Sequence, residues 1–268
     1  MKPRPFNRNW KEWLKRNEYV LLNVVGIVSF FLIWQLLLEF GIIPDKYLSK
    51  PTQVAQTFVE KLTDTRPEGA TLIQNILSSL KVALSGFFLA LLVGIPLGLL
   101  MGWYRVLDKL VRPCFEILRP IPPVAWIPLT ILWLGIGLAA KAFIIFFAAF
   151  IPCVINSYSG IRQTSQAHIN VAKTCGASNW QIFLRVGVPS AIPMIFTGAR
   201  ISLGAAWATL VAAEMLAANA GLGFMIGMGR SFARPDLIVM GMLVIGVIGA
   251  FLAFLLTKME HKFAGWRM

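Results

Sequence analysis

The chain alternates between long apolar runs and shorter polar segments. Six apolar runs approach the roughly 20 residues that a helix needs to cross about 30 Å of hydrocarbon. This pattern predicts an all-α polytopic membrane protein with about six transmembrane helices. The predicted spans are residues 19–40, 82–103, about 120–138, 142–158, about 191–216 and 237–257.

The first apolar run follows a basic N-terminus, as the apolar part of a secretory signal peptide does. The run is long enough to span a bilayer and no small-residue cleavage site follows it, which favours a retained helix. Beyond it, residues 52–62 have an amphipathic pattern, with Pro51 near the start and Thr52 as the expected cap. They predict a short surface helix.

Composition and charge agree with a membrane protein. Hydrophobic residues make up 57% of the chain and charged residues 14%, against about 25% charged in soluble domains. The net charge of +13 lies mostly between apolar runs, which favours anionic lipid over nucleic acid as its partner. The predicted inner segments hold twice as many Lys and Arg residues as the outer ones, so both termini are predicted to be cytoplasmic.

The resulting organisation has five parts. They are a basic cytoplasmic N-terminus (1–18), the first transmembrane helix (19–40), a periplasmic segment (41–81), a core with a cytoplasmic loop at 161–189 (82–257) and a cytoplasmic C-terminus (258–268).

The sequence lacks the residues that several kinds of chemistry require. Cys114, Cys153 and Cys175 have no metal-ligand spacing and are interpreted as reduced packing residues. His168 and His261 lie without ligand partners in the sequence. The sequence holds no Walker-type glycine loop, so it predicts that this chain binds no nucleotide itself. A membrane-embedded enzyme would need a cluster of His, Asp, Glu or Cys, which the sequence does not offer, and no catalytic residue is assigned.

The polar loop at 161–189 is longer than a simple reversal between two spans requires. A helix over about 165–175 is predicted to end at Gly176, which can adopt a left-handed conformation. Ser178 and Gln181 have capping-box spacing and start a second helix, which Pro189 is expected to stop. Trp180 and Phe183 are expected to be exposed anchors for a partner protein.

Three interpretations of this loop remain open on physical grounds. It could be an amphipathic loop on the membrane surface. It could be a DNA-binding helix-turn-helix, although a position between two spans disfavours that function. It could be a docking element for a cytoplasmic subunit that supplies energy.

The loop also resembles the EAA loop of bacterial ABC-importer permeases, which has the pattern EAAxxxGAxxxxxFxxVxLPxxxP. Asn170, Val171 and Val188 depart from the pattern, the first of them by replacing its glutamate. The similarity extends over about residues 20–265 and is strongest to the nitrate/sulfonate/taurine/bicarbonate branch, above all to taurine and alkanesulfonate permeases. The matching positions are Ala172, Gly176, Ala177, Phe183, Val186, Pro189 and Pro193, together with the segments 119–137, 196–216 and 221–227.

This resemblance implies a type I ABC-importer permease fold in the bacterial inner membrane. The permease would form a homodimer and would transmit motion without being an enzyme. Two separate ATPase subunits would bind ATP and Mg, and a periplasmic or lipid-anchored solute-binding protein would deliver the substrate. The residues that would contact the ATPase are Asn170, Ala172, Gly176, Ala177, Trp180, Phe183 and Pro189.

Arg200 is the strongest candidate for a residue that lines the substrate pathway. A charge inside a span costs about 2.5–3.5 kcal/mol on insertion scales and therefore needs a partner or water. Its guanidinium could bind an anion bidentately, or it could pair with a loop carboxylate or lipid phosphate. Trp207 follows on the same helix face and could line the pathway, whereas Thr209 points to another side and could donate to an anion there. Helix packing is the alternative for both.

Three further features complete the pathway candidates. Glu214 could hold an ammonium group or close a gate by pairing with Arg230 or Arg234. Phe224 lies in a glycine-rich segment, residues 217–230, which is expected to be an irregular outer loop. Arg119 begins the proline-rich third span, where broken helix could line a cavity or form a simple kink.

The function expected from this reading is ATP-driven import of a small anionic or zwitterionic solute, with taurine or a sulfonate first. Nitrate, bicarbonate or an aromatic or organic acid are the alternatives within the same class. A self-sufficient secondary transporter or channel is the alternative of another class, but it would predict internal inverted repeats, and none is visible in the sequence.

Overall fold

The computed structural model describes residues 18–217 and 219–264, which form helices and turns without any strand. The all-α prediction is confirmed. The predicted basic N-terminal segment lies almost wholly outside the described residues. The helices are α2 (Glu18–Glu39), α3 (Pro51–Glu60), α4 (Leu72–Trp103), α5 (Arg105–Leu118), the 3₁₀ turn η1 (Pro123–Trp126), α6 (Ile127–Leu134), α7 (Leu138–Arg162), α8 (Gln166–Thr174), α9 (Asn179–Ile182), the π turn η2 (Phe183–Gly187), α10 (Val188–Ala217), α11 (Leu222–Ser231) and α12 (Pro235–Ala264).

Five stretches of helix are long and apolar enough to cross a membrane, and a bent pair of helices can supply a sixth. Four of the five lie in α2, α4, α7 and α12, and the fifth runs from α9 through η2 into α10. The third predicted span, about 120–138, is not one continuous helix, because α5 and the η1–α6 segment meet at 85°; the broken helix expected at its prolines is confirmed. Prolines at 120, 122 and 123 remove backbone donors at this bend.

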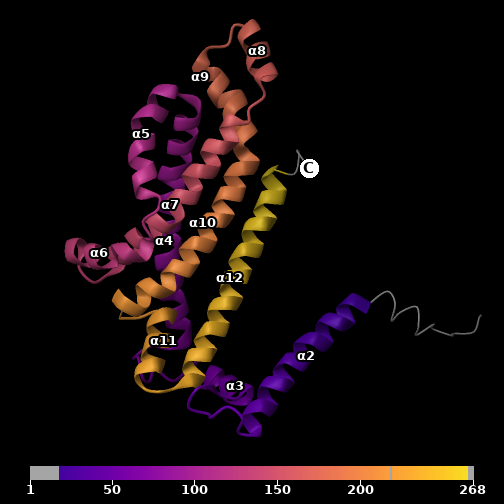
Figure 1. The fold of residues 1–268 in the computed structure, drawn as a ribbon, viewed down its shortest axis with the longest axis vertical. Coiled ribbons are helices and arrows are strands. Elements are labelled where there is room, and N and C mark those ends of the chain that lie inside the picture. Colours follow the sequence, from indigo (N-terminus) through magenta and orange to yellow (C-terminus); the bar gives the residue numbers. More distant parts are fainter. Residues whose placement is uncertain (1–17, 218, 265–268) are drawn as a thin grey trace, which may run out of the picture.

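The core consists of α4, α7 and α10, which lie side by side along most of their length (Figure 1). Small residues allow α4 and α7 to approach closely. A Cβ atom on Gly98 would lie 2.8 Å from the Cβ of Ser157, and one on Gly86 would lie 2.7 Å from the carbonyl oxygen of Ala142. These two glycines therefore fix how near the helices can come.

The first span, α2, stands apart from this core and contacts it through α3 (Figure 1). Only 6% of its apolar window is buried. Glu39 at its end pairs with Lys50, with 3.3 Å between Oε2 and Nζ. A helix that is apolar on all sides and nearly unburied in the monomer is suited to lipid or to a neighbouring chain.

The molecule has two distinct ends, which we call the loop end and the α11 end. Helices α8 and α9 form the loop end, while α3 and α11 lie at the opposite end (Figure 1). The expected amphipathic helix is α3, but Lys50 precedes it and Pro51 is its first residue. The assignment of Thr52 as its cap was therefore wrong, because this residue lies inside the helix.

The three cysteines are free thiols in different surroundings. Cys153 is buried between α4 and α7, whereas Cys114 and Cys175 are exposed. The expectation of packing cysteines thus holds for one of the three.

Candidate functional site

The loop end has the helix–turn–helix shape that its sequence predicts. Helix α8 ends at Thr174, and Gly176 follows in a left-handed conformation with φ of 79°. The N–H of Gly176 donates to the carbonyl of Lys173 at 2.9 Å, and the N–H of Ala177 donates to that of Ala172 at 3.1 Å. These bonds satisfy carbonyl groups at the end of α8 and reverse the chain.

The second helix of this loop starts with the predicted capping box. The backbone N–H of Gln181 donates to the hydroxyl of Ser178 at 3.3 Å, and the backbone N–H of Ser178 donates to the Gln181 side chain at 2.9 Å. Asn170, on α8, accepts a hydrogen bond from Gln166 at 3.0 Å through its side-chain oxygen. The amide that replaces the family's glutamate is thus engaged within its own helix.

The prediction of two exposed aromatic anchors is only half right. Trp180 is 53% exposed, but Phe183 is 4% exposed. The Phe183 ring lies 5.7 Å from the ring of Trp103, 5.9 Å from that of Tyr104 and 5.2 Å from that of Trp180. Phe183 therefore fastens the loop to the end of α4. Trp180 is the aromatic side chain of this loop that remains available to a partner protein.

Pro189 does not stop the second helix, contrary to expectation. The chain continues from α9 through the π turn at Phe183–Gly187 into α10, where Pro189 is the second residue. The wider π turn changes the hydrogen-bond register just before the proline, so its missing donor and its ring do not interrupt the helix. The loop is thereby connected to α10 by continuous helix.

Arg200 and Trp207, two pathway candidates, are engaged in contacts with α12. Arg200 forms an ion pair with Glu260, whose side chain is 12% exposed. The indole N–H of Trp207 donates to the carbonyl of Ile245 at 3.0 Å, and its ring lies against Gly249. These contacts favour the structural alternative for both residues.

Thr209 lies elsewhere, as its helix position predicts, and shares a cavity with Arg119. We call this space, of about 320 Å³, the Thr209 cavity. It is open on one side and is lined by the segment that follows Arg119, by α7 and by α10. Its other lining residues are Ile121, Pro123, Phe147, Ala148, Ile151, Pro152, Ala205 and Ala208.

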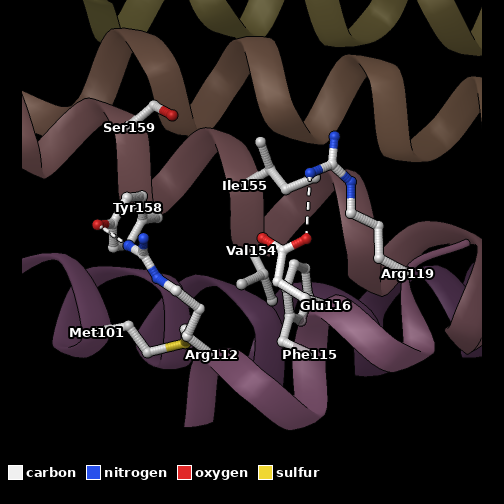
Figure 2. Close-up of a pocket in the computed structure, with 9 residues that line it drawn as sticks. All are labelled: Met101, Arg112, Phe115, Glu116, Arg119, Val154, Ile155, Tyr158 and Ser159. Atoms are coloured by element: carbon white, nitrogen blue, oxygen red, sulfur yellow. Dashed lines mark hydrogen bonds and ion pairs between the residues drawn. The ribbon is translucent and has the colours of Figure 1, made fainter. Parts of the chain in front are cut away.

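A second cavity of about 230 Å³, the Arg112 cavity, lies between α5 and α7 and also contains Arg119 (Figure 2). Arg112 pairs with Asp108 at 2.9 Å and donates a hydrogen bond to the hydroxyl of Tyr158. Arg119 reaches Glu116, with 3.6 Å between Nη1 and Oε2. Both Arg119 and Glu116 are about half exposed, so this pair is weakly held. Arg119 is thus common to the two cavities.

Glu214 forms no pair with Arg230 or Arg234, contrary to one expectation. Its carboxylate is fully buried and accepts hydrogen bonds from the hydroxyl of Ser79, at 2.8 and 2.9 Å, and from the backbone N–H of Gly223 at 2.9 Å. Arg234 instead bonds to Asp236 at 2.5 Å, and this hydrogen bond raises the pKa of the guanidinium. The carboxylate therefore anchors the start of α11.

The residues around Glu214 escaped sequence reasoning. The N–H of Leu222 donates to Ser79 at 2.8 Å, and the N–H of Gly221 donates to the side-chain oxygen of Asn75 at 3.0 Å. Lys141 on α7 is buried and interacts electrostatically with the carboxylate. Asn75 and Ser79 are spaced by four residues in an apolar helix, and this polar stripe was a usable signal.

The same network continues, still buried, into the loop between α3 and α4. Asn75 donates to Glu68 at 3.1 Å, and Glu68 pairs with Lys61 at 2.8 Å. Lys61 is 2% exposed and also donates to three backbone carbonyls of its own loop. Buried polar groups connected in this way hold their elements in one arrangement.

The segment with Phe224 is ordered helix and not the irregular loop expected. Gly221, with φ of 129°, precedes α11, and Phe224 lies half-buried in the first turn of that helix. Glu214 and Ser79 satisfy donors at the start of α11, which explains how so glycine-rich a segment forms a helix.

Comparison with known proteins places these features in context. Residues 94–262 match the family described as binding-protein-dependent transport system inner membrane component. The taurine transport system permease protein TauC of Escherichia coli is 35% identical over 260 residues, which cover 96% of this chain and 93% of that protein. A putative ABC transporter permease protein of Methanocaldococcus jannaschii is 44% identical over 198 residues, 74% of each chain.

The chain is also similar to a permease with another named substrate and to a solved transporter structure. The bicarbonate transport system permease protein CmpB of Synechocystis is 34% identical over 246 residues, covering 90% of this chain and 88% of that protein. Among solved structures, an inward-facing conformation of the MetNI methionine ABC transporter matches with a TM-score of 0.63 and 20% identity, covering 72% of this chain and 95% of the other. This last similarity concerns the fold alone.

Proposed function

Since this chain belongs to the family of binding-protein-dependent transport system inner membrane components, we propose that it imports a small anionic or zwitterionic solute as the transmembrane subunit of an ATP-driven transporter. The ATP would be hydrolysed on a separate cytoplasmic ATPase with Mg. A solute-binding protein would deliver the substrate. The chain itself is a translocation subunit and performs no chemical step.

The observation that carries this proposal is the loop end. It presents an exposed Trp180 on a short capped helix, while Phe183 fastens that helix to α4. An exposed aromatic side chain on a rigid support is a typical anchor at protein interfaces. Because α9 leads through η2 into α10, a push on the loop would move α10 as a unit.

Three further assignments follow from this proposal. The loop end would face the cytoplasm, in agreement with the distribution of Lys and Arg. The α11 end would face the solute-binding protein. Two copies of the chain would enclose the pathway, and the exposed apolar face of α6, with Leu132 79% and Trp133 59% exposed, is suited to that contact.

The proposed substrate is taurine or another sulfonate, on the strength of the similarity to TauC over nearly the whole chain. Similarity to the bicarbonate permease CmpB is almost as high, so bicarbonate is the second candidate. The Thr209 cavity, which is lined by Arg119 and Thr209, suits an oxyanion of either kind.

The test is ATP-dependent uptake by proteoliposomes that contain this chain, its ATPase and its binding protein. Trp180→Ala should lower uptake at least about tenfold, as the loss of a central interface anchor does. Gly176→Val should abolish it, because a β-branched residue disfavours the left-handed turn. Both variants should insert into the membrane, and the amount of protein in the proteoliposomes should equal that of the wild type.

Phe40→Ala is the matched control, since Phe40 is also a large aromatic residue, 74% exposed, and lies at the opposite end of the molecule. Its uptake should equal that of the wild type. Normal ATP-dependent uptake by both Trp180→Ala and Gly176→Val would overturn the proposal that the loop receives the ATPase.

A further inference from the structure

The Thr209 cavity has an unusual balance of charge. Arg119 supplies a cation and Thr209 a hydroxyl, and the rest of its lining is apolar. Within the described part of the chain, no carboxylate lines this cavity. On the basis of the function proposed above, we infer that the Thr209 cavity binds one small oxyanion through Arg119 and Thr209 and discriminates against an anion that also carries an ammonium group, so that among the substrates proposed above it favours a simple sulfonate or bicarbonate over taurine.

The attractive half of this inference rests on the two polar side chains. A guanidinium can donate two parallel hydrogen bonds to a sulfonate, a carboxylate or bicarbonate. A threonine hydroxyl can donate a third. The volume of about 320 Å³ is at the lower end of the range for small-molecule sites, so the cavity suits a compact anion.

The discriminating half rests on what an ammonium group would meet in the same cavity. It would meet mainly apolar side chains and no anionic partner in the lining, and an unpaired charge against apolar side chains is costly. The one aromatic ring in the lining, Phe147, is stacked on Trp126 with ring centres 4.9 Å apart and planes 21° apart. One face of that ring is therefore already covered and is not free for a cation.

Glu116 provides a competitor for the anion. It lines the Arg112 cavity, where its carboxylate lies 3.6 Å from Arg119 (Figure 2). Because Arg119 is common to both cavities, an anion in the Thr209 cavity and the Glu116 carboxylate draw on the same guanidinium. Both side chains of the pair are more than half exposed, so solvent screens their attraction and a ligand can displace it.

The experiment uses the full-length chain in lipid nanodiscs, without nucleotide or partner proteins, and compares two probes by titration calorimetry. Ethanesulfonate and taurine share the sulfonate and the two-carbon chain and differ in the amino group. Ethanesulfonate should bind about tenfold more tightly. Arg119→Ala should weaken its binding at least tenfold, and Thr209→Val about threefold.

Glu116→Gln should act in the opposite direction and tighten ethanesulfonate binding a few-fold, because the competitor loses its charge. Lys109→Ala is the matched control, since Lys109 is an exposed cation on the same helix that lines neither cavity. It should bind like the wild type. Arg119→Lys should keep part of the affinity, which separates a lost contact from a lost fold.

Two results would overturn the inference: taurine binding as tightly as ethanesulfonate, or unchanged ethanesulfonate binding in Arg119→Ala. Neither would bear on ATP coupling, which the uptake of Trp180→Ala and Gly176→Val tests separately. Conversely, loss of the docking interpretation would leave the binding preference of the isolated chain unaffected.

Discussion

Helices α9 and α11, at opposite ends of the molecule, have their N-termini stabilised in opposite ways. At the loop end, the hydroxyl that caps α9 belongs to Ser178 and its partner is three residues away. At the α11 end, the groups that hold α11 come from α4, where the hydroxyl of Ser79 is 143 residues from Leu222 and the amide of Asn75 is 146 residues from Gly221. The start of α9 is thus set by local sequence, whereas the start of α11 is held by residues far away in the chain.

This difference has a functional consequence. A locally assembled element keeps its shape when its surroundings move, which suits a loop that would transmit force to α10. An element held by distant residues keeps its shape only while those residues stay in place. The start of α11 should therefore depend on how α4 and α10 are packed, and substitutions can measure that dependence.

The largest effect is expected for Glu214→Ala. The change leaves the N–H of Gly223 and the hydroxyl of Ser79 without their buried acceptor and opens a cavity, which should lower the free energy of unfolding by about 3–5 kcal/mol. Thermal unfolding of the purified chain in detergent measures the loss, and protease sensitivity of α11 locates it.

Glu39→Ala is the control for that variant. Glu39 is 58% exposed and pairs with Lys50 at the surface, so its loss should change stability by no more than about 1 kcal/mol. Equal unfolding temperatures for Glu214→Ala and Glu39→Ala would show that the buried network does not hold the α11 end.

The same contrast explains which features could be predicted from the sequence. Gly176 and Ser178 were assigned correctly because the groups they satisfy lie within a few residues. The burial of Phe183 was missed because it depends on Trp103 and Tyr104, which are about 80 residues away along the chain. An exposed position on a helix and one covered by a distant element look alike in a sequence.

The candidate pathway shows the same limit. Arg119 and Thr209 were each identified by residue type and position, but nothing in the sequence brings them to one cavity. The prolines of the third span predicted a break, and the direction of the 85° bend depends on contacts with α7. Arg200 was ranked first because it is a charge in a span, but Glu260 on α12 supplies its partner.

Two glycines with positive φ, Gly176 at the loop end and Gly221 at the α11 end, sharpen the comparison further. A Cβ on Gly221 would collide with the buried carboxylate of Glu214, whereas a Cβ on Gly176 would meet no atom within 4 Å. Gly221→Ala should therefore lower the free energy of unfolding by about 2–4 kcal/mol through strain and overlap. Gly176→Ala should cost about 1–2 kcal/mol through backbone strain alone.

Thermal unfolding of both variants in detergent checks this order, with Gly246→Ala as the reference. Gly246 lies within α12, and a Cβ there would also meet no atom within 4 Å, so alanine should leave stability unchanged or raise it by up to about 1 kcal/mol. An equal loss at Gly221 and Gly176 would mean that the distant carboxylate adds nothing to the requirement for glycine.

The smallest effect is expected at the cap of α9. Ser178→Ala removes the acceptor for the backbone N–H of Gln181 and should cost about 1 kcal/mol. Because this cap is local and exposed, the loss should appear as faster amide hydrogen exchange at Trp180, Gln181 and Ile182, with little change in the global unfolding temperature.

Ser165→Ala is the matched control for that cap. Ser165 occupies the same position before α8, but among the described residues its side chain makes no capping hydrogen bond. Exchange in α8 should therefore be unchanged. If Ser178→Ala instead lowered the global unfolding temperature as much as Gly221→Ala does, the loop end would be coupled to the whole fold, and the distinction between a locally built end and a globally held one would fail.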